Sequence, residues 1–135
     1  MIAVPSDQPA LSPPLGILLL SGGHDRAHYA FVLAAGAAAL GRDVVLFATN
    51  RGCLALRPDI GGLDGADRDA LIQARGVAGL ETLRDACLEI GVRLIACEAG
   101  LRAEGLDAAA LLPSVEVAGI ATFLGAVGSG QIVSL

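Results

Sequence analysis

A chain of 135 residues fits one domain, because a chain of this length can bury roughly two thirds of its surface in a single core. The net charge is −5 and the nine basic residues are arginines spread singly along the chain, which argues against nucleic acid as a partner. Hydrophobic residues make up 54% and charged residues only 17%, below the roughly 25% of typical soluble domains, so we expect a homo-oligomer with apolar interfaces.

The N-terminal residues 1–14 contain four prolines, which predicts a mobile tail before a single α/β domain over residues 15–135. The tail lacks the basic start and apolar core of a signal peptide. The longest uncharged apolar run, residues 27–41, is too short to span a bilayer. Since the three cysteines also show no secretory pattern, we expect a cytoplasmic protein that does not contact a membrane.

Short apolar runs alternate with helical patterns along the rest of the chain. The expected strands are residues 15–20, 44–48, 92–96, 115–117 and 131–135. The expected helices are residues 27–40, 54–56, 68–75, 77–90, 98–103, 107–112 and 120–127, with a flexible acidic loop at 59–69. Because no hairpin turns join the strands, the pattern predicts a parallel sheet with helices on both faces, a three-layer α/β/α fold.

Helix 27–40 is apolar nearly all round, so we expect the sheet on one side of it and a neighbouring subunit on the other. Leu80, Leu83, Cys87 and Ile90 share one face of helix 77–90 and are expected to face the core.

Cys97 follows the third strand and precedes a helix. Ligands bind at this edge of open α/β sheets, and the unpaired N–H groups of a helix start favour a thiolate, the nucleophilic form of cysteine. The Glu98 carboxylate opposes a second negative charge beside it. Cysteine is also among the most buried residue types, so Cys97 is either a reactive thiol or a small apolar core residue.

The loops after the first two strands should emerge at the same edge as Cys97. His24 is a proton partner for the thiol, a helix cap or a solvent-facing residue, and Arg51 stabilises an anionic sulfur or pairs with a loop aspartate. The turn at Gly22 and Gly23 is typical of anion sites but lacks the third glycine or the lysine of nucleotide-binding loops. We therefore predict a ligand-binding edge of Gly22, Gly23 and Asn50, no cofactor and no metal.

The order GVAGLETLRDACLEIGVRLIACEAGLRAEGL, then LLPSVEVAGIATFLG, then a short last strand resembles the DsrE/DsrF-like family of small sulfur-relay proteins. The resemblance covers most of residues 15–135. It implies five parallel strands in the order 4-3-2-1-5, assembly into trimers or hexamers, and donor and acceptor proteins for sulfur. Cys97 matches the position of the cysteine that holds sulfur as a persulfide in the family members that carry it.

Three functions remain open on the sequence. The first is sulfur relay through a persulfide on Cys97, as a carrier or as a sulfurtransferase. The second is a non-catalytic oligomeric subunit or small-ligand-binding module in which Cys97 is incidental. The third is thiol redox chemistry with Cys53 and Cys97 as a pair. We expect Cys53 to lie near Cys97 without a disulfide between them, as a resolving thiol.

Overall fold

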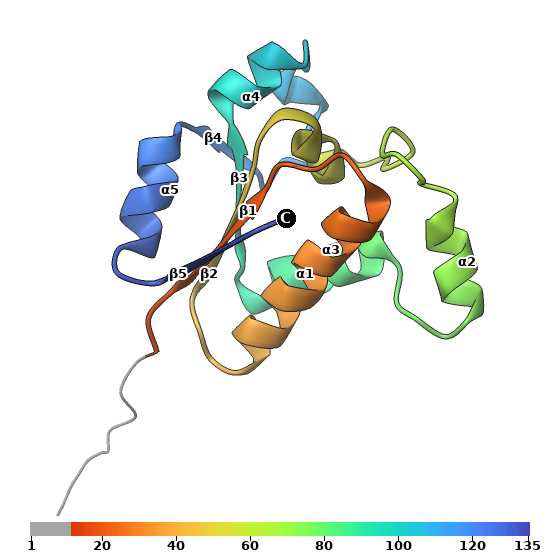
Figure 1. Cartoon of the computed structure of the whole chain (residues 1–135), viewed down its shortest axis with the longest axis horizontal. Coiled ribbons are helices and arrows are strands. Elements are labelled where there is room, and N and C mark those ends of the chain that lie inside the picture. The colour runs from red at the N-terminus through yellow and green to blue at the C-terminus, as the bar shows by residue number, and fades with distance from the viewer. Residues whose placement is uncertain (1–11) are drawn as a thin grey trace, which may run out of the picture.

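The computed structural model describes residues 12–135 and contains one five-stranded parallel sheet in the order β4-β3-β2-β1-β5 (Figure 1). Its strands are β1 (Leu15–Leu19), β2 (Val44–Ala48), β3 (Arg93–Cys97), β4 (Glu116–Ala118) and β5 (Gln131–Ser134). Leu15 pairs with Val44 and Ala48 with Ala96, so the three central strands end together at one edge. The expected fold class and strand order are confirmed.

Helices cover both faces of the sheet. Helices α1 (His24–Ala39) and α3 (Leu80–Ile90) pack on one face, and the shorter α5 (Ile120–Val127) packs on the other (Figure 1). The first face holds the larger core, around Phe31, Leu46 and Leu94. The second holds a smaller core in which the Phe47 and Phe123 rings stack 5.1 Å apart.

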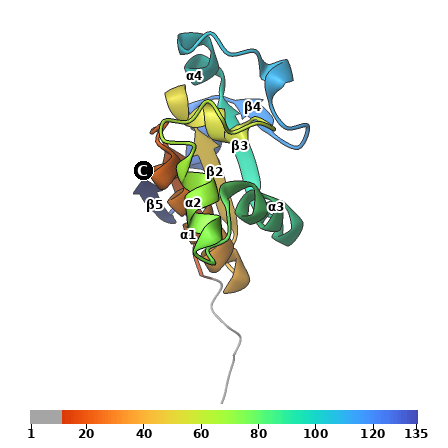
Figure 2. The same cartoon turned by 90° about the vertical axis from the view of Figure 1, so that its right-hand side faces the viewer.

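The remaining helices are short and lie at the edges of the three layers. They are η2 (Asn50–Leu56) and η3 (Ala108–Ala110), which are 3₁₀ helices, together with α2 (Arg68–Ala74) and α4 (Glu98–Ala103). Helix α2 lies outside α1 and apart from the sheet in Figure 1, and it is therefore in front of both in the side view of Figure 2. The Asp107 carboxylate accepts the Ala109 N–H at 3.0 Å, so the expected N-cap is present although the helix is shorter than predicted.

Three helices begin at other residues than the sequence pattern indicated. Helix η2 starts at Asn50 rather than at residue 54. Helix α1 starts at His24 rather than at residue 27, with Gly23 as its N-cap residue and the His24 side chain buried. Helix α3 starts at Leu80 rather than at residue 77, and Ile90 at its end is 48% exposed. The inner side of α1 is buried, while Tyr29 on its outer side is 54% exposed.

The predicted N-terminal tail falls mostly on residues 1–11, which lie outside the described part of the chain. At its end, the carbonyl of Pro13 accepts hydrogen bonds from the Arg42 guanidinium, and the carbonyl of Pro14 accepts the Gln131 N–H. Within residues 12–135, none of the helices combines the length and the apolarity needed to cross a bilayer.

Candidate functional site

Cys97 ends β3 and is the N-cap residue of α4. Its Sγ accepts a hydrogen bond from the Gly100 N–H at 3.3 Å, and the residue is 9% exposed. In the sheet Cys97 pairs with Ala118 of β4, and its side chain belongs to the core under α5. The adjacent Glu98 carboxylate lies 3.5 Å from the Arg102 guanidinium one turn later, which partly offsets its charge. A thiol that accepts an N–H at a strand end can act as a nucleophile.

Helix α4 is seated directly on the link between β2 and η2. A Cβ at Gly100 would lie 2.5 Å from the Asn50 nitrogen and closer still to the Thr49 Oγ1, so only glycine allows this approach. Asn50 has a φ of 52°, and among residues 12–135 it is the one non-glycine residue with left-handed backbone. The backbone of the expected edge residue Asn50 therefore lies against α4, next to the helix start that Cys97 caps.

Cys53 lies in η2. This helix lies so close to the strand ends that a Cβ at Gly52 would collide with the Leu19 carbonyl. Its Sγ donates to the Ala48 carbonyl at 3.4 Å and is fully buried. Burial, and next the nearby charge of Cys97, raise the pKa of the Cys53 thiol to about 11. Both thiols are free, as expected, but they belong to the cores on opposite faces of the sheet. Cys53 is thus a neutral, enclosed neighbour of Cys97.

His24 is bound to partners other than Cys97. Its Nε2 lies 2.7 Å from Asp69 Oδ1, and its ring stacks on His28 with centroids 5.7 Å apart. Burial alone would raise the pKa of Asp69, but hydrogen bonds from the Leu80 N–H and from His24 outweigh it and the pKa is lowered. His24 therefore links α1 to α2 through Asp69, which in turn accepts the Leu80 N–H of α3. The N-cap residue of α1 is Gly23, so His24 is not a helix cap.

Gly22 and Gly23 are covered by the chain's own acidic loop. Asp64 donates its N–H to the Gly22 carbonyl, accepts the His24 N–H at its carbonyl, and forms a bridge with Gly23. Its carboxylate also lies 3.0 Å from the Arg51 guanidinium, the pairing that the sequence left open as an alternative for Arg51. The turn and Arg51 thus bind the loop that contains Asp64.

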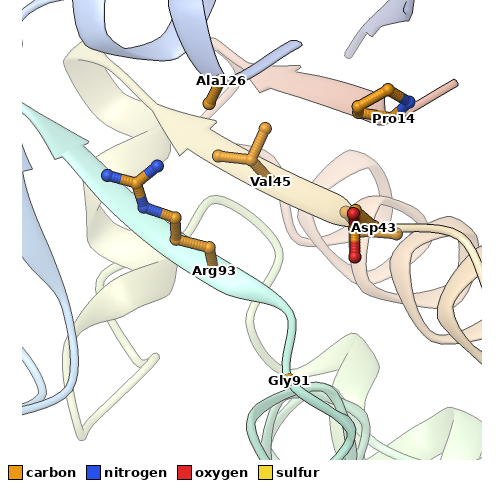
Figure 3. Close-up of a pocket in the computed structure, with 7 residues that line it drawn as sticks. Pro14, Asp43, Val45, Gly91, Arg93 and Ala126 are labelled. Carbon is orange, nitrogen blue, oxygen red and sulfur yellow. The ribbon is translucent and has the colours of Figure 1, made fainter.

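A hollow of about 240 Å³ lies at the opposite edge of the sheet, under α5 (Figure 3). It is lined by Pro14, Asp43, Val44, Val45, Gly91, Arg93 and Ala126. Figure 3 shows the Arg93 and Asp43 side chains on either side of Val45. The Arg93 guanidinium forms a bidentate ion pair with the Glu116 carboxylate, with Nε–Oε2 and Nη2–Oε1 distances of 2.6 Å and 2.8 Å. Since this hollow is at the amino ends of the strands, it is separate from the Cys97 site.

Sequence reasoning missed three residues that shape the site. They are Gly100 and Asp69, whose contacts are described above, and Arg84. The Arg84 side chain on α3 is 3% exposed and donates to the carbonyls at the end of η2. Arg84 could have been found, because it lies at helical spacing between the core residues Leu80 and Cys87. Gly100 and Asp69 act through contacts with segments distant in sequence, which a local pattern does not reveal.

Known proteins resemble this chain in sequence and in fold. The model of the DsrE/DsrF/DrsH-like family matches residues 55–133, more than half of the chain. The chain belongs to this family. The matched residues include β3, Cys97 and all of α4, so the family assignment and the candidate site rest on the same segment.

Two relatives match nearly the full length. One is named sulfur carrier protein DsrE2, from Allochromatium vinosum, and is 28% identical over 150 aligned residues, covering 87% of this chain and 94% of the relative. The other, the uncharacterized protein YrkE from Bacillus subtilis, is 29% identical and covers 86% of this chain and 92% of its own.

Two solved structures share the fold. The ychN protein from E. coli has a TM-score of 0.68 at 15% identity, over 91% of this chain and 99% of its own. MTH1491 from Methanobacterium thermoautotrophicum has a TM-score of 0.52 at 18% identity, over 90% and 99%. At these identities the likeness concerns the fold.

Proposed function

We propose that this family member is a sulfur-relay protein that carries sulfur as a persulfide on Cys97 and passes it to a protein partner. The observation that carries the proposal is the Cys97 thiol at the end of β3, 9% exposed where Cys53 and Cys87 are 0% exposed, with the Gly100 N–H donated to its sulfur. The relative named a sulfur carrier supports the same function. Cys53 and Cys87 are fully buried, so neither offers an alternative carrier position.

Both transfer steps are displacements at sulfur. In loading, the Cys97 thiolate attacks the outer sulfur of a donor persulfide, the donor S–S bond breaks, and the donor leaves as a thiolate. In discharge, an acceptor thiolate attacks the outer sulfur on Cys97, and Cys97 becomes a thiolate again. The two steps together need no oxidant, reductant or cofactor.

Intact-mass measurement after incubation with a persulfide-bearing cysteine desulfurase should show one added sulfur atom per chain. The added sulfur should be lost on treatment with dithiothreitol, because a thiol reductant attacks a persulfide. Cys97→Ser should take up none, whereas Cys87→Ser, which changes a buried core cysteine, should load as the wild type does. Equal loading of wild type and Cys97→Ser would contradict the proposal and favour a subunit in which Cys97 is incidental.

We also propose that the chain forms a homo-oligomer through the side of the molecule that includes α5 and the edge strand β5. Ile120 and Leu124, one turn apart on α5, and Ile132 of β5 are large apolar residues that are 43–50% exposed. Ile132 pairs with Gly16, which faces Phe123 and Val127 of α5, so the three residues lie on the same face of the sheet. Exposed apolar residues grouped in this way are typical of protein–protein interfaces.

Sedimentation velocity at micromolar concentration should show an assembly rather than a monomer. Leu124→Asp should shift the distribution toward the monomer, because a charge buried at an interface without a partner is costly. Leu71→Asp is the matched control, since Leu71 on α2 is 57% exposed and lies away from α5. A monomeric wild type, or equal behaviour of both variants, would contradict the proposed interface.

A further inference from the structure

Gly100 is in contact with both sides of the Cys97 site. Its N–H is the donor to Cys97 Sγ, at 3.3 Å, and its Cα faces the link between β2 and η2. The backbone there is not of the kind that requires glycine, because Gly100 lies within α4 and has no positive φ. The absence of a side chain therefore has to be explained by the space around it.

The space at Gly100 excludes even a methyl group. A Cβ would collide with the Thr49 Oγ1 and with the Asn50 nitrogen, and the second of these is backbone that cannot rotate away. Two other helical glycines, Gly36 in α1 and Gly125 in α5, have no atom within 4 Å of the same position. A side chain at Gly100 would push α4 away from the Thr49–Asn50 link and would move the N–H relative to the sulfur.

We propose that Gly100 is the second functional residue of the sulfur site. Its N–H stabilises negative charge on the Cys97 sulfur, and its missing side chain is what allows α4 to hold that N–H in place. This inference rests on the proposed function for its role in sulfur transfer, while the contact with the thiolate can be tested without any transfer.

The N–H acts on the atom that gains charge in discharge. When an acceptor thiolate attacks the outer sulfur, the S–S bond on Cys97 breaks and its electron pair stays on Cys97 Sγ, while the outer sulfur forms the new persulfide of the acceptor. A donor already placed at Sγ stabilises this leaving thiolate and the transition state that precedes it. The same donor stabilises the free thiolate before loading.

Gly100→Ala is expected to slow iodoacetamide alkylation of Cys97 at pH 7 by about tenfold, the effect of losing one hydrogen bond to a charged group. The pH at half-maximal alkylation should rise, which a purely structural role would not require. Discharge of pre-loaded persulfide to cysteine in a single turnover should slow by about the same factor. Gly36→Ala, which adds a methyl group to an open helical position, should match the wild type in all three measurements.

A second measurement uses the wild-type protein, in case Gly100→Ala does not fold. The Gly100 amide proton, followed by NMR, should move downfield as Cys97 ionises, and this shift should be absent in Cys97→Ser. An unchanged amide signal, or unchanged alkylation in a folded Gly100→Ala, would overturn the role of Gly100. If the wild type shows the amide shift but takes up no sulfur, the proposed function fails and the Gly100 contact remains.

Discussion

Iodoacetamide at pH 7 is expected to label Cys97 in the folded protein while Cys53 and Cys87 stay unmodified. Cys53 and Cys87 are fully buried, and burial raises the pKa of each thiol to about 11. At pH 7 such a thiol is ionised in only about one molecule in ten thousand, and the thiolate is the form that reacts. Burial therefore suppresses both the access and the chemistry of these two thiols.

Peptide mapping at successive times would measure the labelling of each cysteine separately. In denaturant all three should react at similar rates, because unfolding removes the burial that distinguishes them. Early labelling of Cys87 would contradict the position of α3, on which its Sγ donates to the Phe31 carbonyl at 3.6 Å. Early labelling of Cys53 alone would show that η2 opens, and would bring back Cys53 as a resolving thiol for sulfur on Cys97.

The strands could be predicted from the sequence because each central strand is a continuous apolar run. Residues 44–48 match β2 in full, and the expected start of strand one matches β1. A strand buried on both faces is apolar throughout, and the short length of the run distinguishes it from a buried helix. The order of the strands did not follow from any such pattern and came from the family resemblance.

The position of Cys97 could also be predicted, because it depends on where one strand ends. The partners of the other candidate residues could not, because they come from distant parts of the chain. His24 pairs with Asp69 of α2, and Arg51 pairs with Asp64 of the acidic loop before α2. The sequence pattern predicts that loop and helix but not their contacts with the sheet edge. Local patterns place residues at an edge of the sheet, but they do not decide which of them bind one another there.

Arg84→Met is expected to lower the free energy of unfolding by about 3 kcal/mol, a large effect for one substitution. The Arg84 guanidinium is buried and donates to the carbonyls of Ala55 at 2.8 Å, Arg57 at 2.7 Å and Pro58 at 3.4 Å. Methionine fills much of the same volume but donates nothing, so carbonyls at the end of η2 would lose their partners. Arg75→Met on the exposed end of α2 is the matched control and should change stability little.

The loss of Arg84 should also be visible locally, at Cys53. Arg84 holds the end of η2, and η2 encloses the Cys53 thiol over the strand ends, so in Arg84→Met the Cys53 thiol should become reactive toward iodoacetamide before global unfolding. Cys87 lies on α3 itself, packed against α1, and should stay protected under the same conditions. Urea titration gives the global loss and peptide mapping the local one. If Arg84→Met keeps the wild-type stability and its Cys53 stays unreactive, the packing of α3 alone positions η2. The buried Arg84 guanidinium would then not be what holds η2 over the strand ends.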